Sequence, residues 1–223
     1  MNAIQLINTH LELECIGVNS DGLLVRIPGP NPDDIARFYI AQHEGGYSAY
    51  FRHDLPRSIR EQISVLTLET AFSDHDTVTH ILAQDAPCAD MYIGRSYIFP
   101  ETLTPDGYPD AIRLNETHQA LIEQYDPRVR VSRRAVYAII VDGQIASTCE
   151  SSRENSVSAE AWVRTKPEFR RRGFACQVTA AWAHNLQKQG KLPFYSHKCD
   201  NLASQSVAHG LGLVQYIADV GYG

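Results

Sequence analysis

The sequence lacks the features that would take a chain into or across a membrane. No apolar run approaches the roughly 18 residues that a membrane-spanning helix needs. The start, Met1–Gln5, has no basic region followed by an apolar core. The 223 residues have an ordinary hydrophobic fraction of 43%, enough for one large domain or two small ones. These observations predict a cytoplasmic globular protein without a membrane partner.

Cysteine is scarce and shows no pairing pattern. The five cysteines, an odd number, include no Cys-x-x-Cys pair, which favours free thiols in a reducing compartment. Cys149 and Cys199 can each be interpreted as a nucleophile or as a small hydrophobic residue of the core. Because free cysteines are among the most buried residues, we expect the second role for both.

The nine histidines show no metal-binding pattern. None lies in a His-Glu-x-x-His motif, and His75 and His80, five residues apart, do not share one helical face. The sequence therefore predicts no metal site.

Lysine is absent from the first half of the chain. Residues 1–110 hold sixteen acidic residues and six arginines, a balance of −10, whereas residues 111–223 hold fourteen basic and ten acidic residues, a balance of +4. A basic C-terminal half suits an anionic cofactor, and an acidic N-terminal half attracts a cationic amine and repels nucleic acid. The alternative is that these charges only keep the surface solvated. We expect no nucleic-acid partner.

The most informative stretch is Val163–Ala175, where a strand is followed by a basic turn and a helix. Residues 160–165 mix apolar and β-branched types, and from Phe174 apolar residues recur with the period of a helix. The turn between them holds three arginines and Gly173. A helix start offers backbone N–H groups without partners, and glycine lets an oxygen approach closely. The turn predicts a phosphate site, although in isolation it is equally compatible with a solvated loop.

Two motifs in the C-terminal half resemble those of one known family. Arg-x-x-Gly-x-Ala at residues 170–175 matches the Arg/Gln-x-x-Gly-x-Gly/Ala signature of the GCN5-related N-acetyltransferases (GNAT), which move acetyl groups from acetyl-CoA to amines. Asn-x-x-Ser at residues 201–204, followed by Leu-Gly-Leu at 211–213, resembles the next helix of that superfamily. The resemblance covers residues 150–216 and extends to a bacterial subgroup of GNAT acetyltransferases.

The resemblance implies the GNAT acyltransferase fold, an α+β (α/β/α-type) architecture with a mixed, mostly antiparallel central sheet. Residues 106–223 are expected to form this domain, in the order helix, three antiparallel strands, helix, strand, helix, strand. Residues 1–105 are expected to form an N-terminal α+β region that lies on the acceptor side or completes the sheet. The closing strand of the sheet is expected from this N-terminal region, from another subunit in a homodimer, or not at all.

The N-terminal region gives weaker signals. Apolar and alternating runs predict strands at Leu11–Ile16, 23–27, 47–52 and 92–99. Asp33 and Asp34 favour the start of a helix that ends near Gln42, Pro56 favours a second helix, and residues 76–83 predict a third.

In the GNAT family the pyrophosphate of CoA lies on the basic turn, and the pantetheine arm pairs with a strand edge that two separating strands leave open. The resemblance therefore assigns acetyl-CoA binding to residues of the strand, the turn and the next two helices: Val163, Thr165, Arg170, Arg171, Arg172, Gly173, Phe174, Ala175, Asn201 and Ser204. Asn201 is equally well explained as a helix cap.

The resemblance also implies groups that move protons. Glu160 is the expected general base, with the alternative that it faces solvent or pairs with an arginine. One step along a strand turns a side chain to the other face, and a local bulge would restore the register. The usual tyrosine general acid is replaced by Ala208, so Ser204, His209 and Tyr216 are the candidates to protonate the leaving thiolate.

Together the motifs predict an N-acetyltransferase that moves the acetyl group of acetyl-CoA to a primary amine of a small molecule or peptide. Direct attack in a ternary complex is expected, with no acyl-enzyme. The alternative is a catalytically degenerate, CoA-binding regulatory module, which the missing tyrosine at Ala208 favours. A different nucleotide partner would need a Gly-x-x-x-x-Gly-Lys-Ser/Thr loop, which the sequence lacks.

Overall fold

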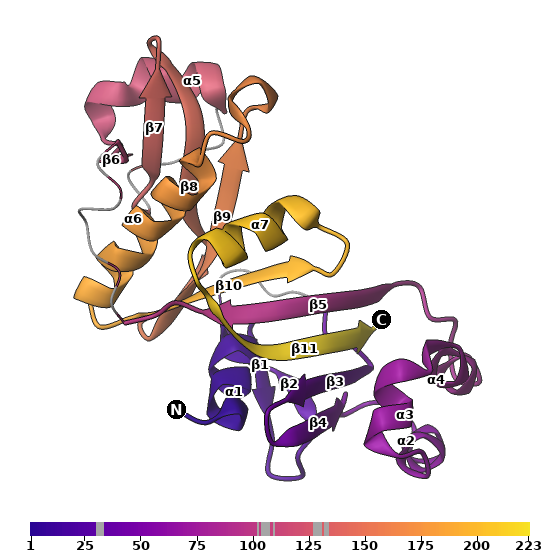
Figure 1. Ribbon diagram of the computed structural model, residues 1–223. Coiled ribbons are helices and arrows are strands. Elements are labelled where there is room, and N and C mark those ends of the chain that lie inside the picture. The colour runs from indigo at the N-terminus through magenta and orange to yellow at the C-terminus, as the bar shows by residue number, and fades with distance from the viewer. Residues whose placement is uncertain (30–33, 102, 104–107, 109, 127–130, 132–133) are drawn as a thin grey trace. The chain divides into compact units, whose positions relative to one another are not determined.

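The structure, a computed structural model, describes residues 1–29, 34–101, 103, 108, 110–126, 131 and 134–223. It is a mixed α+β protein whose strands are mostly antiparallel (Figure 1), which confirms the predicted fold class. The α-helices are α1 (Ala3–Leu13), α2 (Arg57–Ser64), α3 (Leu68–Ser73), α4 (His75–Leu82), α5 (Gln119–Tyr125), α6 (Phe174–Lys188) and α7 (Leu202–Gly210). The strands are β1 (Ile16–Val18), β2 (Leu24–Arg26), β3 (Phe38–His43), β4 (Gly46–Phe51), β5 (Met91–Ile98), β6 (Ile112–Arg113), β7 (Tyr137–Val141), β8 (Gln144–Glu154), β9 (Ser158–Thr165), β10 (Leu192–Lys198) and β11 (Val214–Tyr222).

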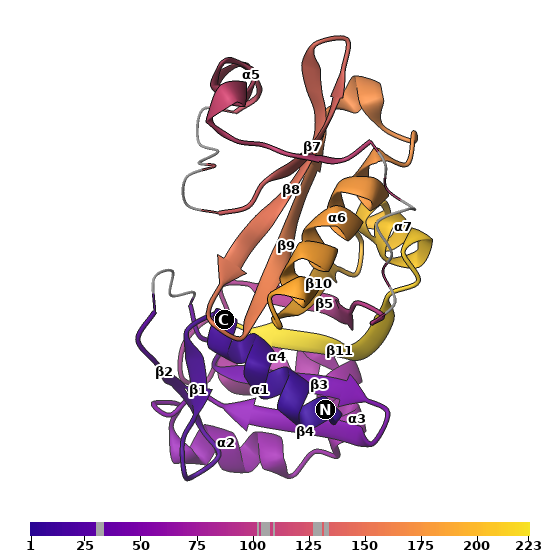
Figure 2. The ribbon, with the colours of Figure 1, turned by 90° about the vertical axis from the view of Figure 1, so that its left-hand side faces the viewer.

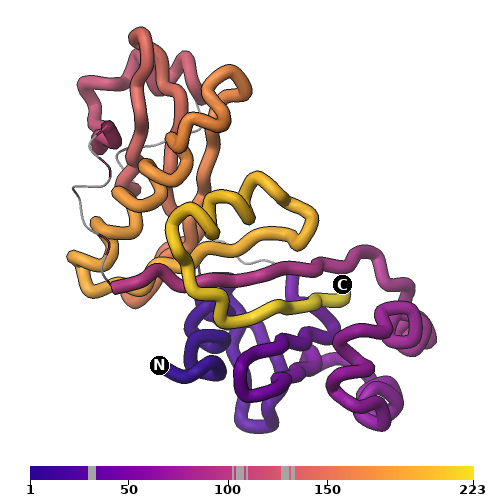
Figure 3. The backbone as a smooth tube through the Cα atoms, in the orientation of Figure 1, coloured from indigo at the N-terminus to yellow at the C-terminus, as the bar shows by residue number. Residues whose placement is uncertain are grey.

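The chain folds into two compact units. The first contains Met1–Tyr97, Ser196–Asn201 and Gln215–Gly223, and the second contains Ile98–Tyr195 and Leu202–Val214. The last strand therefore returns to the N-terminal elements, as the path of the backbone shows (Figure 3). The domain boundary that the sequence predicts between residues 105 and 106 falls outside the residues that the structure describes.

The first unit holds strands in the order β4, β3, β11, β5. β3 pairs antiparallel with β4 along one edge and with β11 along the other, from Phe38↔Tyr222 to Gln42↔Ala218. In the first unit, β11 thus pairs with β3, a strand of the N-terminal region.

Two N-terminal elements differ from the prediction. The first half of the strand expected at Leu11–Ile16 is the end of α1, and Ile16 begins β1. Helix α1 begins with a capping box: the side chain of Asn2 accepts from the Gln5 N–H at 2.9 Å, and the Gln5 side chain accepts from the Asn2 N–H at 2.9 Å. The helix expected to end near Gln42 is the strand β3. Since β3 is paired along both edges, its apolar residues form a nearly continuous run that does not identify a strand by period.

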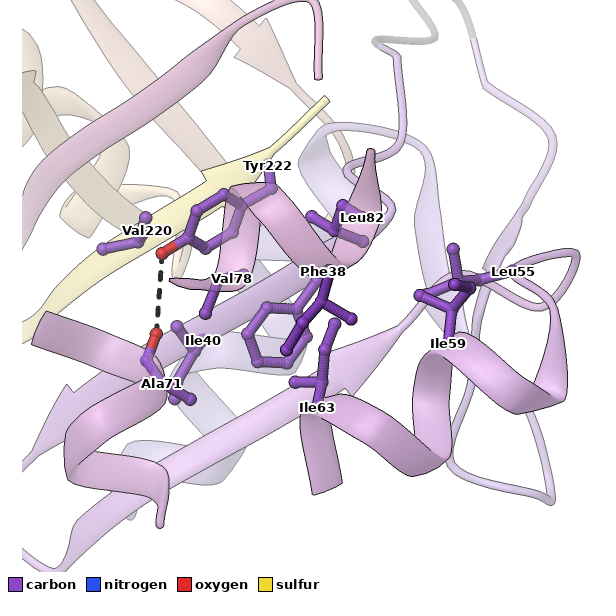
Figure 4. Close-up of a cluster of buried hydrophobic side chains, with 11 residues drawn as sticks. Phe38, Ile40, Leu55, Ile59, Ile63, Ala71, Val78, Leu82, Val220 and Tyr222 are labelled. Atoms are coloured by element: carbon purple, nitrogen blue, oxygen red, sulfur yellow. Dashed lines mark hydrogen bonds between the residues drawn. The ribbon is translucent and has the colours of Figure 1, made fainter. Parts of the chain in front are cut away.

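The core of the first unit lies where α2, α3 and α4 cover the sheet. Figure 4 shows Phe38 and Tyr222 from neighbouring strands among the apolar side chains of these helices. The Phe38 ring stacks on Phe51 and Tyr222, with centroid distances of 5.0 and 5.8 Å. The members of the cluster are Phe38, Ile40, Leu55, Ile59, Ile63, Ala71, Val78, Ile81, Leu82, Val220 and Tyr222.

The second unit holds the antiparallel strands β6, β7, β8 and β9, followed by β10, which runs parallel to β9. The turn from β7 to β8 is Asp142-Gly143, both with positive φ, as a two-residue hairpin requires. Helix α6 packs across β7, β8 and β9 (Figure 2), and its buried Trp182 donates from Nε1 to Ser151 Oγ at 3.1 Å. This order of elements agrees with the one expected for residues 106–223.

Within the described ranges, no helix combines the length and the apolar character that crossing a bilayer requires.

Candidate functional site

The basic turn joins β9 to α6 within the second unit. A single 3₁₀ turn, Pro167–Phe169, follows the strand, and the backbone then takes positive φ at Arg171 (61°) and at Gly173 (77°). A Cβ added at Gly173 would meet no atom within 4 Å, so its backbone conformation, not crowding, favours glycine there. The left-handed conformation of Arg171 is unusual for a residue with a side chain and is the kind of strain that concentrates at ligand-binding loops.

The turn leaves backbone N–H groups without partners. The first bond into α6 runs from the Gln177 N–H to the Gly173 carbonyl at 3.2 Å, and no side chain caps the helix. Among the described residues, the N–H groups of residues 171–175 have no hydrogen-bond acceptor. The side chains of Arg170, Arg171 and Arg172 are exposed. Open N–H groups at the positive end of a helix, beside exposed guanidinium groups, suit a phosphate-bearing ligand.

The strand that leads into this turn separates from its parallel neighbour. Pairing of β9 with β10 extends only from Ser158↔Leu192 to Glu160↔Phe194, whereas pairing of β9 with β8 continues to Thr165. In the described chain, residues 161–165 therefore have no strand partner on the β10 side. This segment contains Val163 and Thr165, two of the predicted cofactor residues, and Arg170 Nε donates to the Thr165 carbonyl at 3.4 Å.

Glu160, the predicted general base, lies where the two strands separate and is 5% exposed. Its Oε2 is 2.6 Å from Arg153 Nη1 and 3.4 Å from Ser152 Oγ. A register shift in β8 between Ser151 and Arg153 places Arg153 directly across from Glu160. The bulge that the sequence analysis considered on β9 thus lies on the neighbouring strand, and it gives Glu160 the arginine partner of the alternative interpretation.

Two residues that the sequence analysis did not single out lie on the same face of the sheet as Glu160. Side chains alternate along a strand, so Trp162 shares the face of Glu160, and Glu150 of β8 is paired with Trp162 in register. Trp162 is 52% exposed. In the sequence, the polar and aromatic residues Glu160, Trp162 and Arg164 alternate with smaller or apolar ones, which is the pattern that could have identified this face. Helix α6 covers the other face of β9.

The carboxyl of Glu150 has an unusual environment. Burial raises the pKa of Glu150, and the charge of Asp126 raises it further, whereas Arg164 and Arg134 act to lower it. Glu150 Oε1 is 3.6 Å from Arg164 Nη2, and the other end of that guanidinium pairs with Asp126. The net effect favours a neutral Glu150 at a higher pH than is usual for a glutamate.

Helix α7 carries the remaining predicted residues. Asn201 is exposed directly before the helix. Ser204 is half-buried, and its carbonyl accepts from the hydroxyl of the buried Tyr195 at 3.4 Å. His209 is exposed in the last turn. Because Ser204 and His209 are five residues apart, they lie on different faces of α7. Tyr195 is a further hydroxyl that the sequence analysis missed.

The cysteines divide between core and surface. Cys149 is fully buried, and burial raises the pKa of its thiol, which keeps it protonated. Its expected place in the core is confirmed. Cys199 is exposed, so its expected burial is wrong. In the part of the chain that the structure describes, no three His, Cys, Asp or Glu side chains gather as metal ligands would.

We compared the sequence with protein families and with curated proteins. Residues 110–218 match the model of a family described as GNAT acetyltransferase. None of the curated proteins that were compared matches the chain.

Two solved structures share the fold. An acetyltransferase from the GNAT family of Colwellia psychrerythraea is 12% identical over 93% of this chain and 79% of its own, with a TM-score of 0.52. A GCN5-related N-acetyltransferase-like protein from Streptococcus suis is 15% identical over 84% of both chains, with a TM-score of 0.50. A GNAT-family protein from Novosphingobium aromaticivorans is 18% identical over 60% of this chain, which spans 66% of that protein's length, at a TM-score of 0.48.

At these identities the structural likeness concerns the fold alone, and the family model adds the sequence motifs. Residues 110–218 of this chain therefore match the GNAT acetyltransferase family by sequence, on a fold that GNAT-family structures share.

Proposed function

We propose that this protein is an N-acetyltransferase that moves the acetyl group of acetyl-CoA to a primary amine of a small molecule or peptide. The observation that carries the proposal is the open start of α6, next to an open stretch of β9: within the described chain, the N–H groups of the first have no acceptor and the second has no partner on the β10 side. The first suits a pyrophosphate and the second suits an extended amide-bearing arm. Acetyl-CoA contains both groups.

In this proposal the donor is held mainly by the backbone. The N–H groups of Arg171, Arg172, Gly173 and Ala175, with Phe174 between them, receive the pyrophosphate, and the three arginine side chains raise the local positive potential. The pantetheine arm pairs with β9 through Val163 and Thr165, as an added strand would. Asn201 contacts the same arm, and Ser204 lies near the sulfur.

The acceptor must lose a proton before it can react. An alkyl ammonium with a pKa of about 10.4 is protonated at neutral pH, and freeing its lone pair at pH 7 costs roughly 4.6 kcal/mol, from about 3.4 pK units at about 1.36 kcal/mol each. The amine nitrogen then attacks the acetyl carbonyl carbon directly. A C–N bond forms, and the C–S bond breaks as the tetrahedral intermediate collapses. The Val163 N–H, or a neighbour, holds the developing oxyanion.

Proton transfer is assigned to carboxylate, hydroxyl and imidazole groups. The base is a carboxylate on the face of the sheet opposite α6, where Glu160, the residue that the resemblance implies, and Glu150 both lie. Ser204 and His209 remain the candidates to protonate the thiolate, with water as an alternative because a CoA thiolate leaves readily. No cysteine has a role in direct attack. We place the reaction in the cytoplasm, where the five free thiols stay reduced, and it uses no metal.

The donor site is tested by titrating acetyl-CoA into purified protein by calorimetry, with Gly173→Glu and Gly190→Glu as a matched pair. Both glycines have a positive φ, 77° and 72°, and neither has an atom within 4 Å of an added Cβ. They bracket the same helix, so both substitutions carry the same backbone strain. Only Gly173→Glu puts bulk and negative charge where the pyrophosphate is proposed to lie.

We expect micromolar binding to the wild type and to Gly190→Glu, and at least a hundredfold loss for Gly173→Glu. Absence of binding to a folded wild type would overturn the proposal. Binding without turnover of any amine would favour the CoA-binding regulatory module, for which the specific observation is the buried Ala208 at the position of the family's tyrosine.

A further inference from the structure

The face of the sheet opposite α6 carries two carboxylates in different situations. Glu160 is 6% exposed at its side chain and holds Arg153 at 2.6 Å. Glu150 is 17% exposed at its side chain, and the guanidinium of Arg164 is 3.6 Å away, beyond hydrogen-bonding distance. Among the described residues, no donor bonds to the Glu150 carboxylate. When Glu160 receives a proton it loses a hydrogen-bonded ion pair with Arg153 at 2.6 Å, whereas Glu150 loses only the longer ion pair with Arg164.

The groups that face Glu150 come from several elements. Arg164 of β9 and Arg134 ahead of β7 are cationic, while Asp126 after α5 is anionic and paired with Arg164. Tyr125 at the end of α5 also faces this carboxyl. With burial added, these groups leave the pKa of Glu150 above its ordinary value. A base works best when its pKa is close to the working pH.

An exposed indole lies beside this carboxyl. Trp162 is directly across from Glu150 in register and is 52% exposed. It is the residue before Val163, in the stretch of β9 where the donor arm is proposed to pair. An indole face attracts an ammonium group, more so than the other aromatic rings do. A carboxylate and an indole side by side therefore suit a protonated primary amine.

From this juxtaposition we propose that Glu150 is the general base of the reaction, taking a proton from the ammonium of an acceptor held against Trp162. The inference rests on the proposed function and names the proton acceptor of its site. The ammonium proton passes to the Glu150 carboxylate, directly or through one water. The freed lone pair forms the C–N bond, the C–S bond breaks, and the second proton that the nitrogen loses is passed to the departing thiolate through Ser204, His209 or water.

The test compares Glu150→Gln with Glu160→Gln. Thiol release from acetyl-CoA is followed with putrescine, benzylamine and a lysine-containing peptide between pH 6 and 9.5. We expect Glu150→Gln to lower kcat/KM for the amine by roughly 10² to 10³ and to remove the acid limb of the pH profile, while acetyl-CoA binding by calorimetry stays unchanged. Glu160→Gln is expected to keep the acid limb. Trp162→Ala is expected to raise KM for the amine more than it lowers kcat.

Thermal stability separates this role from a structural one. A carboxyl whose pKa is raised by folding costs stability while it is ionised, and this cost disappears as the pH falls through its folded pKa. Glu150→Gln is therefore expected to unfold at the same temperature as the wild type or higher at pH 7.5. Glu160→Gln, which removes the carboxylate that pairs with Arg153 at 2.6 Å, is expected to unfold at a lower temperature.

Each outcome has one meaning. If Glu150→Gln has the same kcat/KM as the wild type, or if Glu160→Gln and not Glu150→Gln removes the acid limb, the inference is overturned and the proposed function stands. A wild type that binds acetyl-CoA but acetylates none of the three amines overturns the proposed enzymatic function together with the inference.

Discussion

The two compact units use their polar side chains in different ways. In the first unit, Arg37 is 4% exposed and donates to the carbonyls of Leu82 and Gly223 at 3.2 to 3.3 Å. In the second unit, Arg170–Gly173 are exposed, and the turn N–H groups have no described acceptor. Buried polar groups that are satisfied hold a fold together, and those left open are available to a ligand. Residue type alone therefore does not tell a structural arginine from a ligand-binding one. The burial and the hydrogen-bond partners of the side chain do.

Aromatic residues give the largest contrast. Phe38→Ala removes a ring that is 1% exposed and stacked on Phe51 and Tyr222, so we expect a loss of about 4 kcal/mol in the free energy of unfolding. Trp162→Ala removes a larger ring that is 52% exposed, and we expect a loss below about 1 kcal/mol. Urea unfolding followed by circular dichroism measures both. Equal losses of unfolding free energy for the two variants would show that Trp162 supports the fold as much as Phe38 does.

Arginines give the next contrast. Arg37→Met removes the guanidinium that donates to the Gly223 carbonyl and one of the donors to the Leu82 carbonyl, and it leaves Asp85, 3.6 Å away, without its cation. We expect a loss of about 3 kcal/mol. The control is Arg57→Met, since Arg57 is 85% exposed and pairs only with Glu61 at 2.7 Å among the described residues; its expected loss is under about 0.5 kcal/mol. A stable Arg37→Met protein would show that burial of this guanidinium is not needed by the fold.

Among the substitutions in the core of the first unit, the smallest expected effect concerns one hydroxyl. The Tyr222 hydroxyl lies 2.9 Å from His75 Nδ1 and donates to the Ala71 carbonyl at 3.5 Å (Figure 4). Tyr222→Phe keeps the ring and removes both contacts, so we expect a loss of about 1 kcal/mol in the free energy of unfolding. Thermal unfolding of the two proteins at equal concentration measures it. An unchanged midpoint of thermal unfolding would mean that a water molecule takes the place of the hydroxyl and that water enters this part of the core.

Local sequence signals located most of the second unit. The basic turn that ends at Gly173 and the change of apolar period at Phe174 each act within a few residues, so the turn and the start of α6 follow from the chain itself. The N-terminal region is different because β3 is defined by partners far along the chain, and residues 38–42 have the same apolar character in a helix or in a doubly paired strand. The predicted helix there failed for that reason.

The candidate site shows the same division. The sequence by itself determined the turn at residues 170–175, because a glycine with positive φ, a basic run and a helix start are local properties. Only the tertiary structure decided which carboxylate is held by an arginine, since the bulge in β8 sets Arg153 against Glu160 and leaves Glu150 beside Trp162. The register of two strands, fixed by the packing of whole faces and not by any one residue, determined that outcome.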